Sequence, residues 1–357
     1  MSFQTPHPSE IHQEPAHADF MQRCLQLAVL GSGYTAPNPL VGSVLVHNGR
    51  IIGEGHHELF GAPHAEVNCI QSVVPADRAL IPSSTLYVSL EPCCHYGKTP
   101  PCTDLILREK IPAVVIGCRD PFPEVNGKGI EKLLTHGVAV EYPVLETLSK
   151  EMNRRFFTFH VLKRPYVILK WAQSVNHKIA GKAGVRIKIS NDYSTRLVHK
   201  WRSEEAGILV GKTTALLDDP QLTSRLWPGK NPVRIVTDQN LSLPGSLKLF
   251  DETAPTVVLN GKSDLKEGEI LFKKINGSGI QSILSGIHSL NILSVLVEGG
   301  AKLLQSFIDS GEWDELRIIT NHDLTIQAGI SSPDFGNAKF IKTETLGTDT
   351  IDYYTKI

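Results

Sequence analysis

The chain has 357 residues, of which 41% are hydrophobic and 20% are charged, and 36 Lys and Arg against 37 Asp and Glu give a formal net charge of −1. This composition is typical of an ordinary globular protein, and the length suits two domains better than one. The charge balance argues against a partner that is nucleic acid or an anionic membrane, since proteins that bind either usually carry a basic surplus.

The first 16 residues are predicted to form a disordered lead. They are rich in Pro, His and Glu, and they lack the basic and then apolar segments of a signal peptide. His7, His12 and His17 could bind a metal, but scattered histidines in a polar tail are usually only solvated. No apolar run in the chain approaches the roughly 20 residues of a membrane-spanning helix.

The six cysteines all lie in the first third of the chain. A secreted scaffold held by disulfides would be shorter and richer in cysteine. Cys24 and Cys69 lie in apolar patterns of helical spacing and are predicted to be buried thiols. We therefore expect a protein of the cytoplasm.

Residues 17–150 are predicted to form one α/β domain, because strand patterns alternate with helical ones. Asp19 begins a helix that runs to Ala28. The pair Asn48-Gly49 favours a hairpin turn, since both turn positions need a positive φ. The other elements are expected as strands at 41–46 and 51–55, a helix at 63–73, a strand at 85–90, a helix at 100–108, a strand at 113–117, a helix at 129–136 and a strand at 138–142.

Residues 151–164 are expected to form a helix that connects this domain to a second α/β domain over residues 165–357. The clearest helix of the second domain carries Tyr193, Leu197 and Trp201 on one face. Its strands are expected at 166–171, 207–210, 233–237, 256–259, 294–297 and 316–320.

Three motifs of the first domain combine one histidine with two cysteines. They are His64-Ala65-Glu66, Glu91-Pro92-Cys93, and Cys102 after a Pro-Pro pair, and each lies where a loop or strand end meets the start of a helix. One His and two thiolates make a three-ligand zinc site that leaves the fourth tetrahedral position open for water. Helix N-termini favour negative charge and so help to hold cysteine as thiolate.

Zinc at such a site would lower the pKa of a bound water to near neutrality. Glu66, two residues after His64, is near enough to move a proton without being a ligand. A His-x-Glu element combined with a Pro-Cys element is the arrangement of zinc deaminases. The alternative is a structural zinc site closed by a fourth ligand, for which Cys94 or His95 is available.

The spans Pro37–Gly42, His64–Val67 and Leu90–Cys102 resemble the bifunctional deaminase-reductases of riboflavin biosynthesis. Most zinc deaminases of nucleosides and bases place their two cysteines two residues apart, whereas this chain has the longer insertion that is typical of the riboflavin enzymes. The resemblance implies a cytidine-deaminase-like three-layer α/β/α domain. It would use Zn²⁺ to hydrolyse the amino group from a diamino-ribosylaminopyrimidinone phosphate, giving an amino-uracil phosphate.

The resemblance also implies roles for single residues of this domain. His64, Cys93 and Cys102 would bind zinc, Glu66 would move protons, and Asn38, His57 and Lys98 would contact the base and the phosphate. Lys98 suits phosphate as a point charge. The plainer alternatives are an exposed loop cation for Lys98, a turn residue for Asn38 and a surface histidine for His57.

The resemblance continues over residues 169–174, 208–225 and 297–300, which are similar to the reductase domain of the same family. It implies a fold like that of dihydrofolate reductase and an NADPH-dependent reduction of the ribosyl group to a ribityl chain, with hydride transfer to C1′. Backbone N–H groups after Gly299-Gly300, at a helix start, can hold a cofactor phosphate. Many such turns bind no ligand, so this motif alone is weak.

Residues of the second domain that match cofactor contacts of the family are Ala172, Lys188, Thr214, Asp218, Gly299 and Gly300, and those that match substrate contacts are Arg186, Arg202, Leu222, Arg225 and Glu298. Arg202 and Arg225 suit a bidentate grip on phosphate. Asp218 and Asp219 could alternatively only start the turn at Pro220.

The chain departs from the family at two places. Arg186 stands where the family usually has Ser, and Lys188 stands where it has Trp, so two cations replace an aromatic stacking surface. The tail beyond Asn321 also matches the family poorly.

Three functions are therefore compared. The first is the bifunctional enzyme, acting on a small phosphorylated pyrimidine, with no nucleic-acid or membrane partner, as a homo-oligomer. The second is a zinc deaminase of a nucleoside or tRNA base whose second domain is not catalytic. The third is a non-catalytic, zinc-stabilised RNA-binding module, against which the charge balance and Glu66 both speak. We expect the first.

Overall fold

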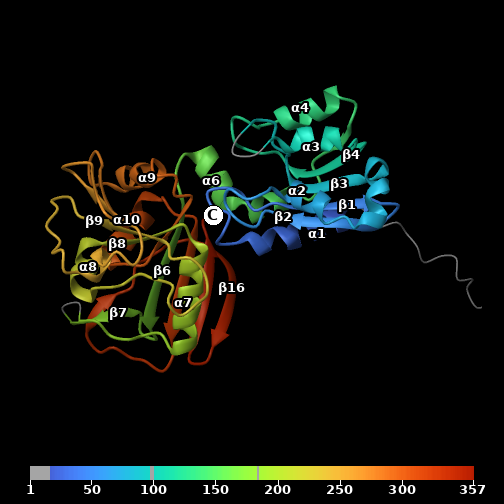
Figure 1. Ribbon diagram of the computed structural model, residues 1–357. Coiled ribbons are helices and arrows are strands. Elements are labelled where there is room, and N and C mark those ends of the chain that lie inside the picture. The colour runs from blue at the N-terminus through green and yellow to red at the C-terminus, as the bar shows by residue number, and fades with distance from the viewer. Residues whose placement is uncertain (1–16, 97–99, 183–184) are drawn as a thin grey trace, which may run out of the picture. The chain divides into compact units, whose positions relative to one another are not determined.

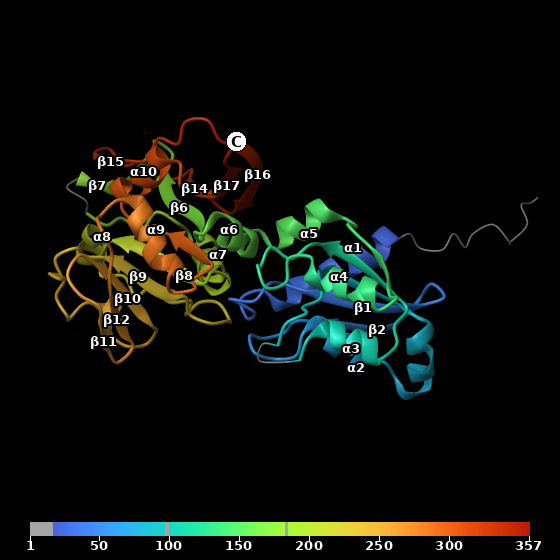
Figure 2. The ribbon, with the colours of Figure 1, turned by 90° about the horizontal axis from the view of Figure 1, so that it is seen from above.

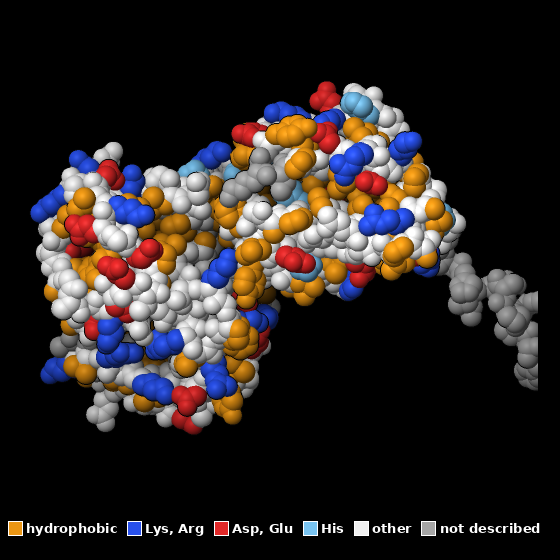
Figure 3. Space-filling model, viewed as in Figure 1, with side chains coloured by type: hydrophobic (Ala, Val, Ile, Leu, Met, Phe, Trp, Pro, Cys, Tyr) orange, Lys and Arg blue, Asp and Glu red, His pale blue; other side chains and the backbone are white. Residues whose placement is uncertain are grey.

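The computed structural model describes residues 17–96, 100–182 and 185–357. The chain divides after Arg154 into two compact units, which are described separately (Figure 1). The predicted disordered lead, His7, His12 and Lys98 lie outside the described residues. No helix among the described residues is long and apolar enough to cross a membrane. On the face that Figure 3 shows, both units carry basic and acidic side chains, in agreement with the nearly equal numbers of basic and acidic residues in the sequence.

The first unit is built on a five-stranded sheet of order β2-β1-β3-β4-β5. β1 pairs antiparallel with β2 and β3, while β3, β4 and β5 are parallel. The strands are β1 Gly42–His47, β2 Arg50–His56, β3 Thr85–Leu90, β4 Ala113–Cys118 and β5 Ala139–Glu141. The helices are α1 His17–Ala28, α2 Ala65–Gln71, α3 Cys102–Arg108, α4 Lys128–Thr135 and α5 Glu146–Met152, with 3-10 segments at Val29–Gly31 and Pro75–Ser83.

Alternate residues of this sheet face two different helix layers, as the pleat of a strand requires. Leu45, Leu86 and Ile116 pack in one buried cluster with residues of α2, α3 and α4. Val44 and Tyr87 pack in another cluster with residues of α1. The predicted three-layer α/β/α arrangement is confirmed. The predicted hairpin turn is also confirmed, because Asn48 and Gly49 have φ values of 47° and 74°.

The second unit contains a ten-stranded sheet of order β11-β12-β10-β9-β8-β13-β6-β14-β17-β16, which Figure 2 shows from β11 at one end to β16 at the other. β12, β10, β9, β8, β13, β6 and β14 run parallel, and β11, β17 and β16 add antiparallel ends. The strands are β6 Tyr166–Ser174, β8 Gly207–Gly211, β9 Val233–Thr237, β10 Thr256–Asn260, β11 Leu265–Glu267, β12 Ile270–Lys274, β13 Ser294–Val297, β14 Glu315–Asn321, β16 Lys339–Leu346 and β17 Asp349–Thr355.

Helices cover both faces of the large sheet. The helices are α6 Arg154–Leu162, α7 Asp192–Glu204, α8 Lys212–Asp218, α9 Ile280–His288 and α10 Ala301–Ser310, with a 3-10 segment at Lys248–Phe250 and a separate two-stranded sheet of β7 Lys178–Gly181 and β15 Gly329–Ser331. Residues of α9 and α10 pack in one buried cluster with strand residues such as Leu169 and Leu209. Residues of α7 and α8 pack with Ile168 and Ile208, which point the other way. The predicted α/β class is confirmed for this unit.

One prediction of local structure is wrong, and a second is wrong for one residue. The single helix expected over residues 151–164 is two helices, α5 and α6, that meet at Asn153. The side chain of Asn153 is bonded to the backbone N–H and carbonyl of Leu40, each at 2.8 Å, and its own backbone leaves the helical region at φ −104° and ψ 21°. On α7, Trp201 is buried and Leu197 packs against the same cluster, as expected, but Tyr193 is 69% exposed and Val198 is buried in its place.

A buried network of charges joins α6 to the sheet of the second unit. The Nε of Arg155 donates to Glu205 at 2.7 Å, and the Nη2 of Arg317 lies 3.9 Å from the same carboxylate. The side chain of Glu205 is fully buried. Burial alone would raise the pKa of Glu205, but the attraction of Arg155, its hydrogen bond and the attraction of Arg317 lower the pKa to about 2.

Replacing Glu205 by Gln is expected to destabilise the second unit by about 3 kcal/mol, because the partly buried Arg155 loses its carboxylate partner and the buried Arg317 keeps only Glu315. The pKa of Glu205 is lowered in the folded chain, so its stabilisation is complete above the ordinary glutamate pKa of about 4.5 and is lost as the pH falls towards 2. The difference between wild type and Glu205→Gln should therefore shrink between pH 5 and pH 2, by the same linkage.

Urea unfolding followed by tryptophan fluorescence checks this, because all four tryptophans, Trp171, Trp201, Trp227 and Trp313, belong to the second unit. Glu204→Gln is the matched control, since the neighbouring Glu204 side chain is 31% exposed and lies 3.8 Å from Lys200. Equal unfolding free energies for wild type and Glu205→Gln at neutral pH would contradict the prediction.

Candidate functional site

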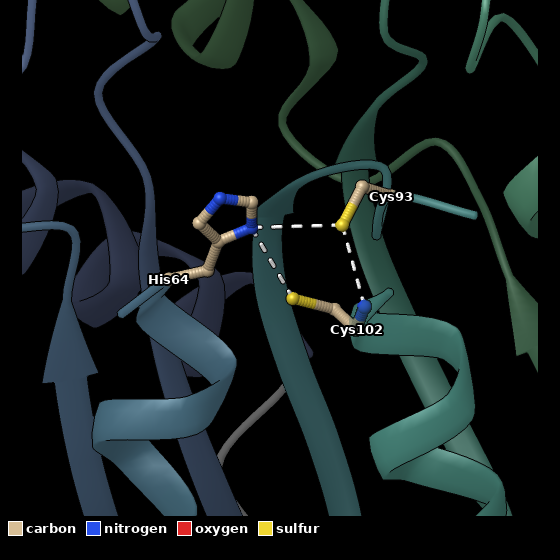
Figure 4. Close-up of side chains that lie close together, drawn as sticks. All are labelled: His64, Cys93 and Cys102. Atoms are coloured by element: carbon tan, nitrogen blue, oxygen red, sulfur yellow. Dashed lines mark hydrogen bonds between the residues drawn. The ribbon is translucent and has the colours of Figure 1, made fainter. Parts of the chain in front are cut away.

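Three side chains of the first unit converge at the starts of two helices. His64 precedes α2 with an extended backbone, Cys93 follows β3, and Cys102 is the first residue of α3. The Nδ1 atom of His64 lies 3.5 Å from Sγ of Cys93 and 3.4 Å from Sγ of Cys102 (Figure 4). No other group of three or more His, Cys, Asp or Glu with this proximity occurs in the part of the chain that the structure describes.

The geometry of these three atoms fits a zinc ion. Zinc bonds of about 2.0 Å to nitrogen and 2.3 Å to sulfur at a tetrahedral angle separate the nitrogen and the sulfur by about 3.5 Å. All three candidate ligand atoms lie within 4.8 Å of one another. The set of one imidazole and two thiols is one that zinc prefers, and it leaves a fourth position for a reacting molecule.

The surroundings of Cys93 favour its thiolate form. The backbone N–H of Cys102 lies 3.3 Å from Sγ of Cys93. Hydrogen bonds from the Cys102 side chain and from His64 lower the pKa of Cys93 to about 4, although burial opposes them. The pKa of Cys102 is raised because its thiol takes part in the bond to Cys93 and is buried. The site therefore stabilises a thiolate, which is the form of cysteine that binds metals.

Glu66 lies in the first turn of α2 and is only 3% exposed. Burial is the main cause that raises the pKa of its carboxyl group, and the charge of His64 acts in the opposite direction. Its carboxylate also interacts with the side chain of Cys102. Glu66 thus lies beside two of the candidate ligands without belonging to the group of three.

Asn38 and His57 lie together next to the same group. The amide Nδ2 of Asn38 is 3.1 Å from Nε2 of His57, and the His57 ring packs edge-on against the His64 ring at 5.4 Å. His57 is 2% exposed, and its Nδ1 is 3.0 Å from the Pro63 carbonyl. His57 is therefore a buried histidine with both ring nitrogens in hydrogen bonds, and of this pair only Asn38 has polar atoms to spare.

Cys94 and His95 do not join the three converging residues. The sulfur of Cys94 lies 3.6 Å from the carbonyl oxygen of Glu124, and Nε2 of His95 is 3.9 Å from the carboxylate of the same residue. Neither side chain is therefore placed to close the site as a fourth ligand.

In the second unit, Arg202 and Glu298 form a buried ion pair. Two guanidinium nitrogens of Arg202 donate to the two carboxylate oxygens of Glu298 at 2.7 Å each, and a third donates to the Thr223 carbonyl at 3.1 Å. The Nζ of Lys170 lies 3.8 Å from Glu298. Burial raises the pKa of Glu298, but Arg202 and Lys170 together lower it to about 2. The fork of Arg202 that could grip phosphate is thus directed to Glu298.

Lys170 was not among the site residues predicted from the sequence. It occupies a strand position between Leu169 and Trp171, both buried, and it is itself largely buried. A lysine inside such an apolar run was a readable signal, because lysine is seldom buried without a partner. The pKa of Lys170 is lowered, chiefly by burial.

The turn at Gly299-Gly300 lies against Thr214. A Cβ atom added at Gly300 would be 3.0 Å from the hydroxyl of Thr214, and Gly300 has a φ of 69°. α10 begins at the next residue. The remaining predicted residues lie nearby in the sequence or fold. Leu222 is buried, and the guanidinium of Arg225 lies 3.5 Å from the Thr223 hydroxyl. Ala172 is partly buried and packs against the cluster that contains Val198 and Trp201 of α7.

The two cations that replace the family's Ser and Trp have different surroundings. The guanidinium of Arg186 lies 3.5 Å from the carbonyl oxygen of Asp218, so two predicted site residues are neighbours. Lys188 is paired with Asp192 at 2.7 Å, and its side chain is 72% exposed. The structure thus brings Arg186, but not Lys188, into contact with another predicted site residue.

Comparisons with known proteins cover both units. Residues 15–118 match the family described as the cytidine and deoxycytidylate deaminase zinc-binding region, and residues 165–322 match the RibD C-terminal domain. The riboflavin biosynthesis protein RibD of Aquifex aeolicus is 38% identical over 353 residues, which is 95% of this chain and 98% of that protein. RibD of Actinobacillus pleuropneumoniae is 37% identical over 86% of this chain and 84% of its own length.

A solved structure from Thermotoga maritima superposes on the chain with a TM-score of 0.86 and 37% identity, covering 96% of this chain and 99% of that one. It is described as a diaminohydroxyphosphoribosylaminopyrimidine deaminase and 5-amino-6-(5-phosphoribosylamino)uracil reductase. The similarity therefore extends over both units and is not confined to one domain.

Proposed function

The chain belongs to the RibD family of bifunctional riboflavin biosynthesis enzymes, and from its two sites we infer that the first unit is a zinc-dependent deaminase and the second an NADPH-dependent reductase. The substrate we propose is 2,5-diamino-6-(ribosylamino)pyrimidin-4-one 5′-phosphate. The observation that supports the first step most directly is the convergence of His64, Cys93 and Cys102.

In the first step, His64, Cys93 and Cys102 would hold the zinc, which when bound supplies a water activated for hydrolysis. Water adds to the ring carbon that bears the amino group, the C–N bond breaks and ammonia leaves. Glu66, buried beside the ligands, would accept the proton from the water and return it to the departing nitrogen. The free polar atoms of Asn38 would orient the pyrimidine.

In the second step, NADPH when bound would supply a hydride to C1′; the C1′–O4′ bond opens and O4′ takes up a proton from solvent, so that the ribosyl group becomes a ribityl chain. The N–H groups that follow Gly299-Gly300, together with Thr214, would hold a cofactor phosphate. Glu298, fixed by the fork of Arg202, would present its carboxylate to the substrate, and Arg225 would contact the substrate phosphate. We also propose Ala172, Asp218, Leu222 and Arg186 as contacts of the same site.

Both steps can be followed in one solution of purified protein. With the diamino compound, ammonia release should precede oxidation of NADPH, whereas the deaminated compound should be reduced without any release of ammonia. Removal of zinc by a chelator should stop the first step only. If the intact protein binds no NADPH, the reductase assignment fails and the alternative of a deaminase with a non-catalytic second unit takes its place.

Lys188 provides a finer test of the cofactor site. If Lys188 replaces the missing aromatic contact by charge, Lys188→Ala should weaken NADPH binding by roughly 1 kcal/mol, and more at low salt than at high salt because its charge is exposed. Asp192→Asn removes only its acidic partner, so it should bind NADPH at least as tightly as wild type. Titration of the intact protein with NADPH across salt concentrations measures both. If Lys188→Ala binds NADPH with wild-type affinity at every salt concentration, the charge of Lys188 does not replace the missing aromatic contact.

We further propose a homo-oligomer in the cytoplasm. β16 forms one edge of the ten-stranded sheet and exposes Phe340 and Ile341, and an exposed edge with apolar side chains favours association. Sedimentation of the purified protein tests the assembly, and a monomer at micromolar concentration would contradict it.

A further inference from the structure

A buried carboxylate stands two residues before the zinc ligand Cys93. Glu91 is 3% exposed and forms no ion pair with any described residue. Its carboxylate instead accepts four hydrogen bonds from backbone N–H groups: those of Asp120 at 3.2 Å, Gly127 at 2.9 Å, Gly129 at 2.9 Å and Ile130 at 3.2 Å. A buried charge without such compensation would be costly, so these four contacts explain why a glutamate is tolerated here.

The four donors lie in the loop before α4 and in the first turn of that helix. The first N–H groups of a helix have no partner within it and are usually bonded by the side chain of the N-cap residue. The N-cap of α4 is Gly127, which has no side chain and adopts a left-handed conformation with φ 91°. Glu91 therefore caps α4 from a distant part of the chain, and its negative charge suits the positive end of the helix.

The same helix start presses against the residue between Glu91 and Cys93. A Cβ atom added at Gly129 would lie 2.2 Å from the carbonyl oxygen of Pro92. The start of α3 holds the next residue, because the carbonyl oxygen of Cys93 accepts hydrogen bonds from the backbone N–H of Thr103 at 3.1 Å and from the Thr103 hydroxyl at 3.2 Å. The backbone around Cys93 is thus held between the starts of α4 and α3, and α3 also carries the ligand Cys102.

We propose that Glu91 is a positioning residue of the zinc site, which holds Cys93 at binding distance from His64 and Cys102 by capping α4. It acts through the backbone of Pro92 and does not touch the substrate. An amide could not replace it, because four N–H groups need acceptors while glutamine offers one oxygen and turns an NH₂ group towards the remaining donors. The proposal rests on the zinc site of the proposed function.

The test measures zinc release from the full-length, zinc-loaded protein to a chromogenic chelator. Loss of a residue that orients a ligand usually costs tenfold or more in metal affinity, so Glu91→Gln should release zinc about tenfold faster than wild type or more. Glu131→Gln makes the same change of charge at an exposed position of α4 and should release zinc as wild type does. Zinc content of the wild type is measured first. A wild type without zinc would refute the zinc site itself, whereas a zinc-loaded wild type with an unaffected Glu91→Gln variant would refute only the positioning role of Glu91.

Leu133→Ala separates positioning from loss of stability. Leu133 is fully buried on α4, and its truncation should lower the melting temperature without moving Cys93. Its zinc release should stay near the wild-type rate, and its Co²⁺-substituted form should keep the wild-type absorption band, whereas Glu91→Gln should alter that band. If Glu91→Gln releases zinc no faster than Leu133→Ala, the proposal is overturned.

Gly129→Ala tests the contact between the start of α4 and the backbone of Pro92, and it can be used also if Glu91→Gln does not fold. Alanine favours the helix, but its Cβ would lie 2.2 Å from the Pro92 carbonyl oxygen and 3.1 Å from a carboxylate oxygen of Glu91. The variant therefore disturbs both contacts of the helix start while it keeps the charge of Glu91. Zinc release should again be about tenfold faster or more, by the same loss of ligand orientation. A wild-type release rate in Gly129→Ala would overturn the link between α4 and Cys93.

Discussion

A Cys102→Ser variant is expected to lose its zinc and, with it, all measurable deamination, whereas Cys94→Ser keeps both. Cys102 places its sulfur 3.4 Å from Nδ1 of His64, and no other described cysteine except Cys93 comes as near to that histidine. Two ligands hold zinc far less well than three, and a serine hydroxyl is a poor substitute for a thiolate. Cys94 is directed to the carbonyl of Glu124 and contributes no ligand atom.

Metal analysis of the purified variants, together with ammonia release from the diamino compound, measures both effects. Reduction of the deaminated compound by NADPH provides an internal control, because Cys102 belongs to the first unit and the reductase residues belong to the second. Cys102→Ser should therefore keep the second activity. If Cys94→Ser lost zinc while Cys102→Ser kept it, the proposed ligand set would be wrong.

The first unit was predictable because its chemistry lies in short, local patterns. The hairpin followed from Asn48-Gly49, the helix starts followed from proline and apolar spacing, and His64, Cys93 and Cys102 were named from their motifs. The anchoring role of Glu91 was not predictable, since its four partners are 29 to 39 residues away. Only the fold brings the start of α4 to that carboxylate.

The second unit was less predictable for two different reasons. The pairing of Arg202 with Glu298 joins residues that are 96 positions apart, so the sequence could not show that the guanidinium fork is occupied. The hairpin of β16 and β17 was missed because β16 is an exposed edge strand, whose side chains lack an alternating apolar pattern. The helix α9 could have been predicted from the sequence, since its apolar residues recur at helical spacing: Ile280, Ile283, Leu284 and Ile287.

The largest loss of rate without loss of the metal is expected for Glu66→Gln. Glutamine has the size of glutamate and can occupy the same buried position, but it cannot accept a proton. Because Glu66 is not among the three converging ligands, zinc should stay bound. Deamination should fall by about 10²–10⁴-fold, which is the usual contribution of a positioned acid or base.

The loss should appear in kcat rather than in KM, because the proton transfer belongs to the transition state and not to substrate binding. Metal analysis must show one zinc per chain in both proteins before their rates are compared. Glu58→Gln is the matched control, since Glu58 is an exposed glutamate of the same unit.

The second reaction decides whether any such loss is specific to the proton transfer. Glu66→Gln should reduce the deaminated compound with NADPH at the wild-type rate, since Glu66 lies in the first unit. It should also fail to oxidise NADPH when only the diamino compound is supplied, because the second step then has no substrate. Near-normal ammonia release by a zinc-loaded Glu66→Gln protein would exclude Glu66 as the proton carrier. Another group beside the metal would then have to accept the proton from water.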